Sequence, residues 1–153
     1  MAYWKAGVVC VTEQLNSPNP ALEPVSKARV ILADDNFELL AEAARSLRTE
    51  FDVVATVTNG SALLRACERL RPDVVVVDIS MPDLDGLQAA AALQGSGSAI
   101  VFFTGHEERA FFDEAMALGA LGYVFKRSPP WVLSAAVRAA GTGHAFHDPK
   151  LES

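Results

Sequence analysis

Five side chains that could serve phosphoryl chemistry stand at the ends of four short apolar runs in this 153-residue sequence. They are Asp34, Asp35, Asp78, Thr104 and Lys126. Each run is typical of a buried β-strand, and the carboxyl ends of parallel strands meet at one edge of a sheet. We therefore expect three carboxylates, a hydroxyl and an ammonium to share one small site. Such a set suits a divalent cation and a phosphoryl group better than an organic cofactor.

Strand-like and helix-like segments alternate along the chain from Lys27 onward. We expect strands at Arg29–Ala33, Val53–Val57, Asp73–Val77, Ala99–Phe103 and Leu121–Phe125. We expect helices over residues 35–47, 59–70, 87–94, 107–118 and 128–141. The third strand contains four consecutive valines, which indicates burial on both faces. Five strands alternating with five helices predict an open, doubly wound α/β fold, (βα)5, with a five-stranded parallel sheet.

Two helix starts carry recognisable cap patterns. Asp35 is expected to open the first helix, with Glu38 completing a pattern like a capping box. Ser128 is expected to cap the last helix, with Pro129 in its first turn. Both starts directly follow strands that end in candidate site residues.

Composition restricts the class of protein. With 50% hydrophobic and 21% charged residues, the chain can build a full core. A net charge of −6 does not attract nucleic acid or anionic lipid. No apolar stretch approaches the roughly 20 residues of a membrane span, and no signal-peptide pattern is evident. Cys10 and Cys67 fit no metal spacing, so we expect two reduced cysteines in a cytoplasmic protein.

The turn after the first strand excludes a nucleotide cradle. Such a cradle needs glycines and hydroxyl groups, whereas residues 33–37 contain two carboxylates that would repel a phosphate. The same carboxylates favour Mg²⁺ with oxygen ligands. Asp78 could then attack phosphorus, with Lys126 and Thr104 balancing the charge of the product. Taken singly, Asp35 could be only a cap, Thr104 only a β-former and Lys126 only a solvated end; their convergence favours function.

Together these residues resemble the receiver domain of bacterial two-component response regulators over residues 28–141. Asp34 and Asp35 correspond to the family's acidic pair, and the segment from Asp78 to Gly86 corresponds to its phosphoacceptor loop. Thr104 corresponds to the switch hydroxyl, and the segment from Ala120 to Lys126 to the fifth-strand motif. The resemblance implies a flavodoxin-like fold.

The resemblance also implies a mechanism. A sensor histidine kinase would transfer a phosphoryl group to Asp78, and slow self-catalysed hydrolysis would reset the switch, so the chain is not expected to be a turnover enzyme. Asp35, Asp78 and the backbone carbonyl of Ser80 would bind Mg²⁺, with Asp34 acting through water. Phosphorylation would draw Thr104 toward the phosphoryl group.

Five further positions bear on the switch by resemblance. Tyr123 would rotate inward after phosphorylation. Ser80 and His106 would tune the lifetime of the phosphate by steering the attacking water, although both could instead be solvated loop residues. Arg127 stands where a proline often follows the lysine, and Gly105 stands where alanine is usual.

The ends of the chain suggest its context. Residues 1–27 form an extension, for which we favour a mobile arm over an added strand at residues 7–11. Residues 142–153 look like the linker of the NarL/FixJ subfamily, which leads to a helix-turn-helix domain. The chain could be an isolated receiver of a longer transcription regulator or a single-domain regulator. We do not expect this chain to bind DNA or a membrane.

The output is expected to be a protein–protein contact. A homodimer could form through the fourth helix, fifth strand and fifth helix, although for each apolar residue taken singly we favour core packing. These residues are Phe111, Phe112, Met116, Tyr123 and Trp131. Two rival functions remain. One is a receiver-like scaffold that is never phosphorylated. The other is a haloacid-dehalogenase-type phosphohydrolase, which would need a second Asp at the position of Ser80.

Overall fold

The computed structural model describes residues 26–152 and contains one parallel sheet with the strand order β2-β1-β3-β4-β5-β6. The strands are β1 Arg29–Ala33, β2 Asp52–Val57, β3 Val74–Val77, β4 Ala99–Thr104, β5 Gly122–Phe125 and β6 Phe146–His147. The helices are α3 Phe37–Leu47, α4 Gly60–Leu70, α5 Gly86–Ala92, α6 Arg109–Ala117, α7 Pro130–Gly141 and the 3-10 helix η1 Pro149–Glu152. The expectations for an N-terminal arm, an added strand there and Cys10 lie outside the described residues.

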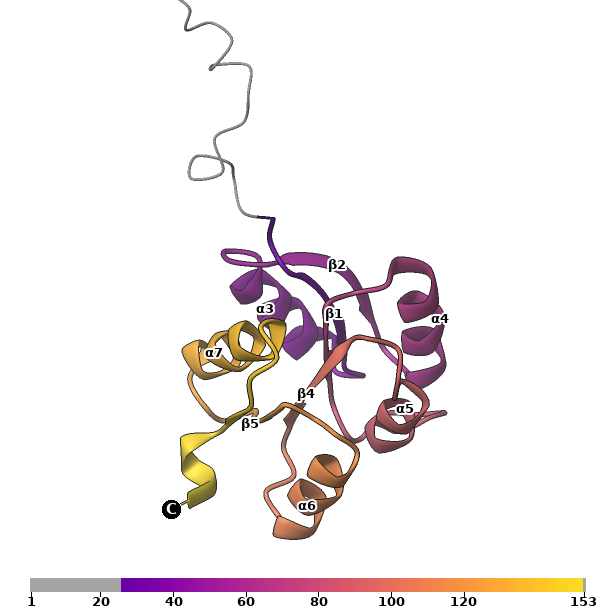
Figure 1. Ribbon diagram of the computed structural model, residues 1–153. Helices are drawn as coiled ribbons and strands as arrows, with labels where there is room; N and C mark the ends of the chain where they lie inside the picture. Colours follow the sequence, from indigo (N-terminus) through magenta and orange to yellow (C-terminus); the bar gives the residue numbers. More distant parts are fainter. Residues whose placement is uncertain (1–25, 153) are drawn as a thin grey trace, which may run out of the picture.

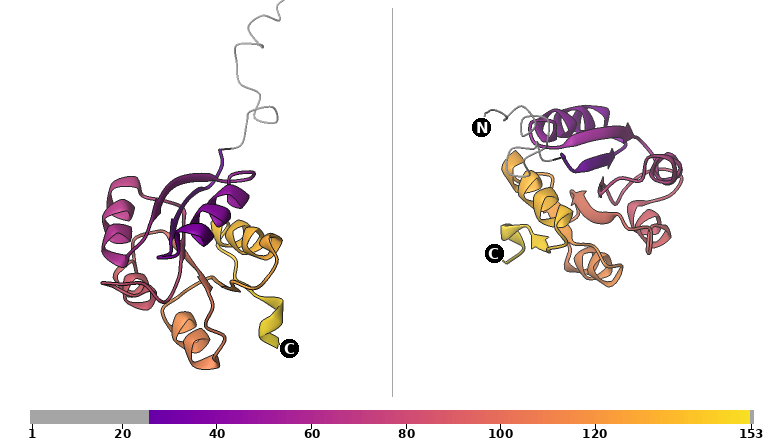
Figure 2. Two further views of the ribbon diagram at one scale, coloured as in Figure 1. Left: turned by 180° about the vertical axis from the view of Figure 1, so that it is seen from behind. Right: turned by 45° about the horizontal axis from the view of Figure 1, so that its top comes forward.

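The sheet is covered on both faces, as Figures 1 and 2 show. Helices α3 and α7 pack on one face over alternate residues of the central strands, including Val30, Leu32 and Val76. Helices α4, α5 and α6 pack on the other face, over residues such as Ile31 and Val75. Every residue of β3 is buried, which confirms the expectation drawn from its four valines. The doubly wound α/β class is therefore confirmed.

The order of the strands reverses between β1 and β3. The chain builds β2 outward on one side of β1 and then returns to build β3, β4 and β5 on the other. Loops after β1 and β3 consequently leave the sheet toward opposite faces, and a crevice forms at the carboxyl edge between them. Asp34 and Asp78 are the first residues after these two strands, so the topology itself places them side by side.

The sheet has six strands rather than the expected five. Phe146 and His147 pair in parallel with Gly122 and Tyr123 of β5. The amide of Phe146 donates to the carbonyl of Leu121 at 2.8 Å, so this part of the segment expected to resemble a linker is docked on the sheet. Two residues are too few for a strand pattern to stand out in sequence, which explains the difference.

Both predicted helix caps are wrong by one residue. Asn36, not Asp35, caps α3, and its side-chain oxygen accepts hydrogen bonds from the amides of Glu38 and Leu39. Pro129 occupies the cap position of α7 and makes no side-chain cap bond. The Ser128 hydroxyl donates instead to Asp148 at 2.5 Å. In both cases the expected cap residue instead lies in the loop that precedes the helix.

The apolar residues proposed for a dimer face divide between core and surface. Tyr123 is buried, and its ring contacts Phe112 edge-on with centroids 5.4 Å apart. Trp131 on α7 is 62% exposed. Core packing therefore explains Tyr123 and Phe112, whereas it does not explain Trp131. Cys67 is a buried free thiol, and burial raises its pKa to about 11.

None of the helices within residues 26–152 is both long enough and apolar enough to span a membrane.

Gly60 has a steric requirement that can be tested. A Cβ atom at this first residue of α4 would lie 2.2 Å from the backbone oxygen of Leu84, in the loop after β3. We expect Gly60→Ala to lower the free energy of unfolding by about 1–3 kcal/mol, because the loop or the helix must shift. Urea denaturation measures this change. Gly105→Ala is the control, because a Cβ atom at that residue would meet no other part of the described chain within 4 Å. Equal stability of the two variants would contradict the close packing.

Candidate phosphoacceptor site

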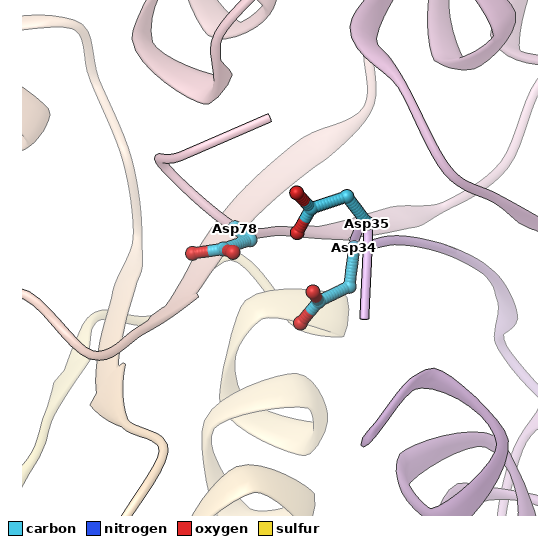
Figure 3. A group of neighbouring side chains, drawn as sticks. All are labelled: Asp34, Asp35 and Asp78. Carbon is cyan, nitrogen blue, oxygen red and sulfur yellow. The ribbon is translucent and has the colours of Figure 1, made fainter. Parts of the chain in front are cut away.

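Three carboxylates converge at the carboxyl edge of the sheet. Asp34 and Asp35 follow β1, Asp78 follows β3, and one oxygen from each lies within 4.8 Å of the others. Figure 3 shows the three side chains gathered around one space. Asp34 and Asp78 are buried, at 4% and 5% exposure, whereas Asp35 is exposed. The predicted acidic group is therefore brought together, with one member open to solvent.

Lys126 links the two buried carboxylates. Its Nζ atom lies 2.8 Å from an oxygen of Asp34 and 2.9 Å from an oxygen of Asp78. The residue follows β5, and its backbone amide donates to the carbonyl of Thr104 on β4 at 2.9 Å. The ammonium thus reaches across the edge of the sheet to strands β1 and β3. The predicted convergence of Lys126 on the acidic group is confirmed.

The local charges alter the pKa values of the pair. Burial raises the pKa of Asp78, with a further contribution from the charge of Asp34, and the ammonium of Lys126 opposes this rise. Burial alone would lower the pKa of Lys126, but its bonds to Asp34 and Asp78 outweigh burial and raise the pKa. The lysine therefore stays charged. Any further positive charge that enters the site would stabilise the ionised form of Asp78 and so lower its pKa.

Thr104 and Tyr123 meet at the backbone of His106. Thr104, the last residue of β4, is fully buried, and its hydroxyl oxygen accepts a hydrogen bond from the amide of His106 at 3.0 Å. The Tyr123 hydroxyl donates to the carbonyl of His106 at 2.9 Å. Burial, with the nearby charges of Glu108 and Glu107, raises the pKa of Tyr123 to about 12, so the phenol remains a donor. The tyrosine already lies inward in this structure.

Ser80 and His106 lie against each other beside the acidic group. The Ser80 Oγ atom is 2.6 Å from the Nε2 atom of His106. The imidazole ring lies against Phe111, with centroids 4.3 Å apart, and its Nδ1 atom is 3.6 Å from a carboxylate oxygen of Glu108. The same surface hollow is lined by Asp35, Ser80, His106 and Phe111. The pair therefore spans the loops after β3 and β4 next to the site.

The loop after Asp78 folds tightly against its own strand end. The amide of Gly86 donates to the carbonyl of Ile79 at 2.7 Å, and a Cβ atom at Gly86 would lie 2.1 Å from the Asp78 carbonyl oxygen. Asp85 caps α5 through a complete capping box with Gln88. Glycine is needed here because any side chain would push the loop away from Asp78.

The donor set fits a hard divalent cation. Three carboxylates face one ammonium, and a cation with oxygen ligands would balance the remaining negative charge. Magnesium favours sites with few carboxylate ligands and several waters, and the exposed position of Asp35 leaves room for such waters.

Two residues near this edge were absent from the sequence-based candidates. Asn36 accepts the α3 cap bonds, and its own amide donates to an oxygen of Asp34 at 2.9 Å. Asp148 is buried beside the turn that carries Lys126. The signal for Asn36 was its strong preference for cap positions. An acid before a proline in an apparent linker gave little indication of burial at Asp148.

Comparisons with known proteins agree with this geometry. The response regulator receiver domain matches residues 30–138. The transcriptional regulatory protein DesR of Bacillus subtilis (strain 168) is 32% identical over 124 residues, which cover 80% of this chain and 62% of DesR. The chain therefore spans less than two thirds of that relative.

Solved structures show the same fold. The signal receiver domain of NarL from Mycobacterium tuberculosis has a TM-score of 0.75 at 29% identity, covering 78% of this chain and 100% of that domain. The isolated receiver domain of RcsB from Salmonella enterica serovar Typhimurium, in the presence of the phosphomimetic BeF3-, has a TM-score of 0.77 at 25% identity, covering 83% and 97%. With the receiver-domain match over residues 30–138 and the acidic site at the sheet edge, the chain belongs to the response regulator receiver domain family.

Proposed function

We propose that this chain accepts a phosphoryl group on Asp78 from a sensor histidine kinase and thereby switches a protein–protein contact. The observation that carries the proposal is the buried carboxylate of Asp78, 2.9 Å from the Lys126 ammonium and grouped with Asp34 and Asp35. A nucleophile, an acidic cation site and a fixed positive charge are the parts that phosphoryl transfer needs.

In the proposed step an oxygen of Asp78 attacks the phosphorus atom. A new O–P bond forms, the P–N bond to the kinase histidine breaks, and the imidazole leaves with the electron pair. Lys126 balances charge on the transferred group, and Thr104 supplies a hydroxyl donor once its side chain moves toward that group. Asp35, Asp78 and the Ser80 carbonyl would hold Mg²⁺ directly, and Asp34 would act through water. The ion would neutralise charge between the carboxylates and the phosphoryl group.

The same site supports a switch rather than a turnover enzyme. The acyl phosphate would hydrolyse slowly and return Asp78 to its starting state. Ser80 stands where a haloacid-dehalogenase-type hydrolase would carry its acid, so this rival lacks a proton donor there. The non-phosphorylated scaffold has less support, because the three carboxylates and Lys126 are all present and lie close to one another.

We propose a role in transcription control, in the cytoplasm, because DesR is named as a transcriptional regulatory protein. In a longer parent, a helix-turn-helix domain would follow the receiver and bind DNA. We do not expect the receiver itself to bind DNA, because the whole chain has a net charge of −6 and would be repelled by the DNA phosphates. A homodimer through α6, β5 and α7 would use Trp131, the exposed aromatic residue on α7.

Phosphorylation can be tested directly. Incubation with acetyl phosphate or phosphoramidate and Mg²⁺ should add the mass of one phosphoryl group, because Asp78 is a cation-assisted nucleophile. Asp78→Asn should abolish the added mass, as measured by intact-protein mass spectrometry. Asp113→Asn, at an exposed carboxylate on α6, is the control and should be labelled like the wild type. Absence of labelling by both donors and by cognate kinases would favour the scaffold.

Magnesium binding should depend on the acidic group. We expect Asp35→Asn to weaken Mg²⁺ binding by about tenfold or more, because it removes a ligand from the solvent side of the site. Isothermal titration calorimetry measures the affinity, and the Mg²⁺-induced rise in unfolding temperature gives an independent readout. The same control, Asp113→Asn, should keep wild-type binding. Unchanged affinity in Asp35→Asn would place the ion elsewhere.

The contact between Ser80 and His106 gives a third test. If these side chains hold the water that attacks the phosphoryl group, replacing both with alanine should slow dephosphorylation by about fivefold, a modest effect for loss of water positioning. Phosphate release from labelled protein measures the rate. An unchanged rate would identify both as solvated loop residues, and a faster rate would show that they shield the phosphate instead.

A further inference from the structure

One buried carboxylate in the described part of the chain lies outside the acidic site. Asp148 is only 1% exposed, and it directly follows the short strand β6. Burying a charged group costs free energy unless strong hydrogen bonds compensate. The arrangement around Asp148 therefore indicates what this carboxylate does.

The carboxylate of Asp148 accepts three hydrogen bonds from the described residues. One oxygen, Oδ2, accepts from the backbone amide of Phe125 at 2.9 Å and from the Ser128 hydroxyl at 2.5 Å. The other oxygen, Oδ1, accepts from the backbone amide of Lys150 at 2.9 Å. Bonds to a charged acceptor are about twice as strong as neutral ones. Two of the three bonds hold the chain between Phe125 and Ser128.

The carboxylate continues the hydrogen-bond ladder beyond β6. The amide of Asp148 donates to the carbonyl of Tyr123 at 2.8 Å, in the register of a parallel pair. Two residues farther along β5, the amide of Phe125 meets the side chain of Asp148 instead of another backbone carbonyl. The side chain thus pairs a backbone group at the end of β5 that the two-residue strand β6 does not reach.

The turn that Asp148 holds, from Phe125 to Ser128, contains Lys126. Its amide is bonded on the opposite side of β5, to the carbonyl of Thr104 at 2.9 Å. The Ser128 amide closes the turn by donating to the Phe125 carbonyl at 3.0 Å. Hydrogen bonds on both sides of β5 therefore hold this turn. Asp148 supplies those on the β6 side.

We propose that Asp148 is a positioning residue for phosphoryl transfer at Asp78. By fixing both ends of the turn, its carboxylate holds the Lys126 ammonium 2.9 Å from Asp78 and 2.8 Å from Asp34. The reaction named here rests on the proposed function, but the placement of Lys126 by Asp148 can be measured without phosphorylation. Through Asp148, the C-terminal segment thereby contributes to the rate of phosphoryl transfer to Asp78.

The kinetic test separates positioning from simple anchoring of β6. In Asp148→Ala, the maximal rate of phosphorylation by acetyl phosphate should fall about tenfold, since displacements near 1 Å can cost still more. The donor concentration at half-maximal rate and the Mg²⁺ affinity should stay within about twofold, because the acidic group is untouched. Ser128→Ala removes one of the two turn bonds and should have a smaller effect.

A control variant accounts for lost stability. Val137→Ala removes buried packing between α7 and the sheet but leaves the turn bonds in place. Its urea denaturation curve should show destabilisation, whereas its maximal phosphorylation rate should remain that of the wild type at temperatures where it is fully folded. An equal loss of rate in Val137→Ala and Asp148→Ala would overturn the proposal.

A second readout does not require phosphorylation. Lys126 is 18% exposed and paired, so acetic anhydride should acetylate its amine slowly, as followed by peptide mass spectrometry. Asp148→Ala should speed this labelling by about fivefold, as expected when a local structure opens more often. If the wild type is never phosphorylated, the proposed function fails and the labelling rate decides the placement of Lys126. Unchanged labelling, or faster labelling with an unchanged phosphorylation rate, would overturn the role of Asp148.

Discussion

The ammonium of Lys126 between Asp34 and Asp78 is the interaction on which the arrangement of the site depends. It joins the end of β5 to the ends of β1 and β3, with both nitrogen–oxygen distances below 3 Å. Two buried carboxylates so close together would repel each other strongly without it. One positive charge does not balance three carboxylates, however, and the remaining negative charge is what makes the edge receptive to a cation.

The strand order brings Asp34 and Asp78 close enough for Lys126 to contact both. Since β1 and β3 are neighbours at the reversal of strand order, the residues that follow them diverge to opposite faces and leave a crevice. Close backbone packing then shapes the crevice, at Gly86 against Asp78 and at Gly60 against Leu84. The inward Tyr123, bonded to the carbonyl of His106, connects the same edge to the packing under α6.

Sequence patterns predicted the parts of the structure that depend on continuous runs. The valines of β3 and the polar residues at the strand ends located the sheet and most of the site. Features that depend on a few residues were not predicted correctly. The helix caps are Asn36 and Pro129 rather than their neighbours, because adjacent polar or proline residues compete for the cap position. Strand β6 and the burial of Asp148 escaped because both depend on tertiary pairing with β5, which has no local signature.

Strand β6 also covers an edge of the sheet that could otherwise pair with another chain. All four residues of β5 are buried and apolar or small, and such a strand at an open edge invites pairing with other chains. Here the edge is only two residues long, the Asp148 carboxylate satisfies the last amide of β5, and Pro149 offers no amide of its own. A chain cut before residue 146 would expose the edge of β5, so the C-terminal segment doubles as protection against strand-to-strand aggregation.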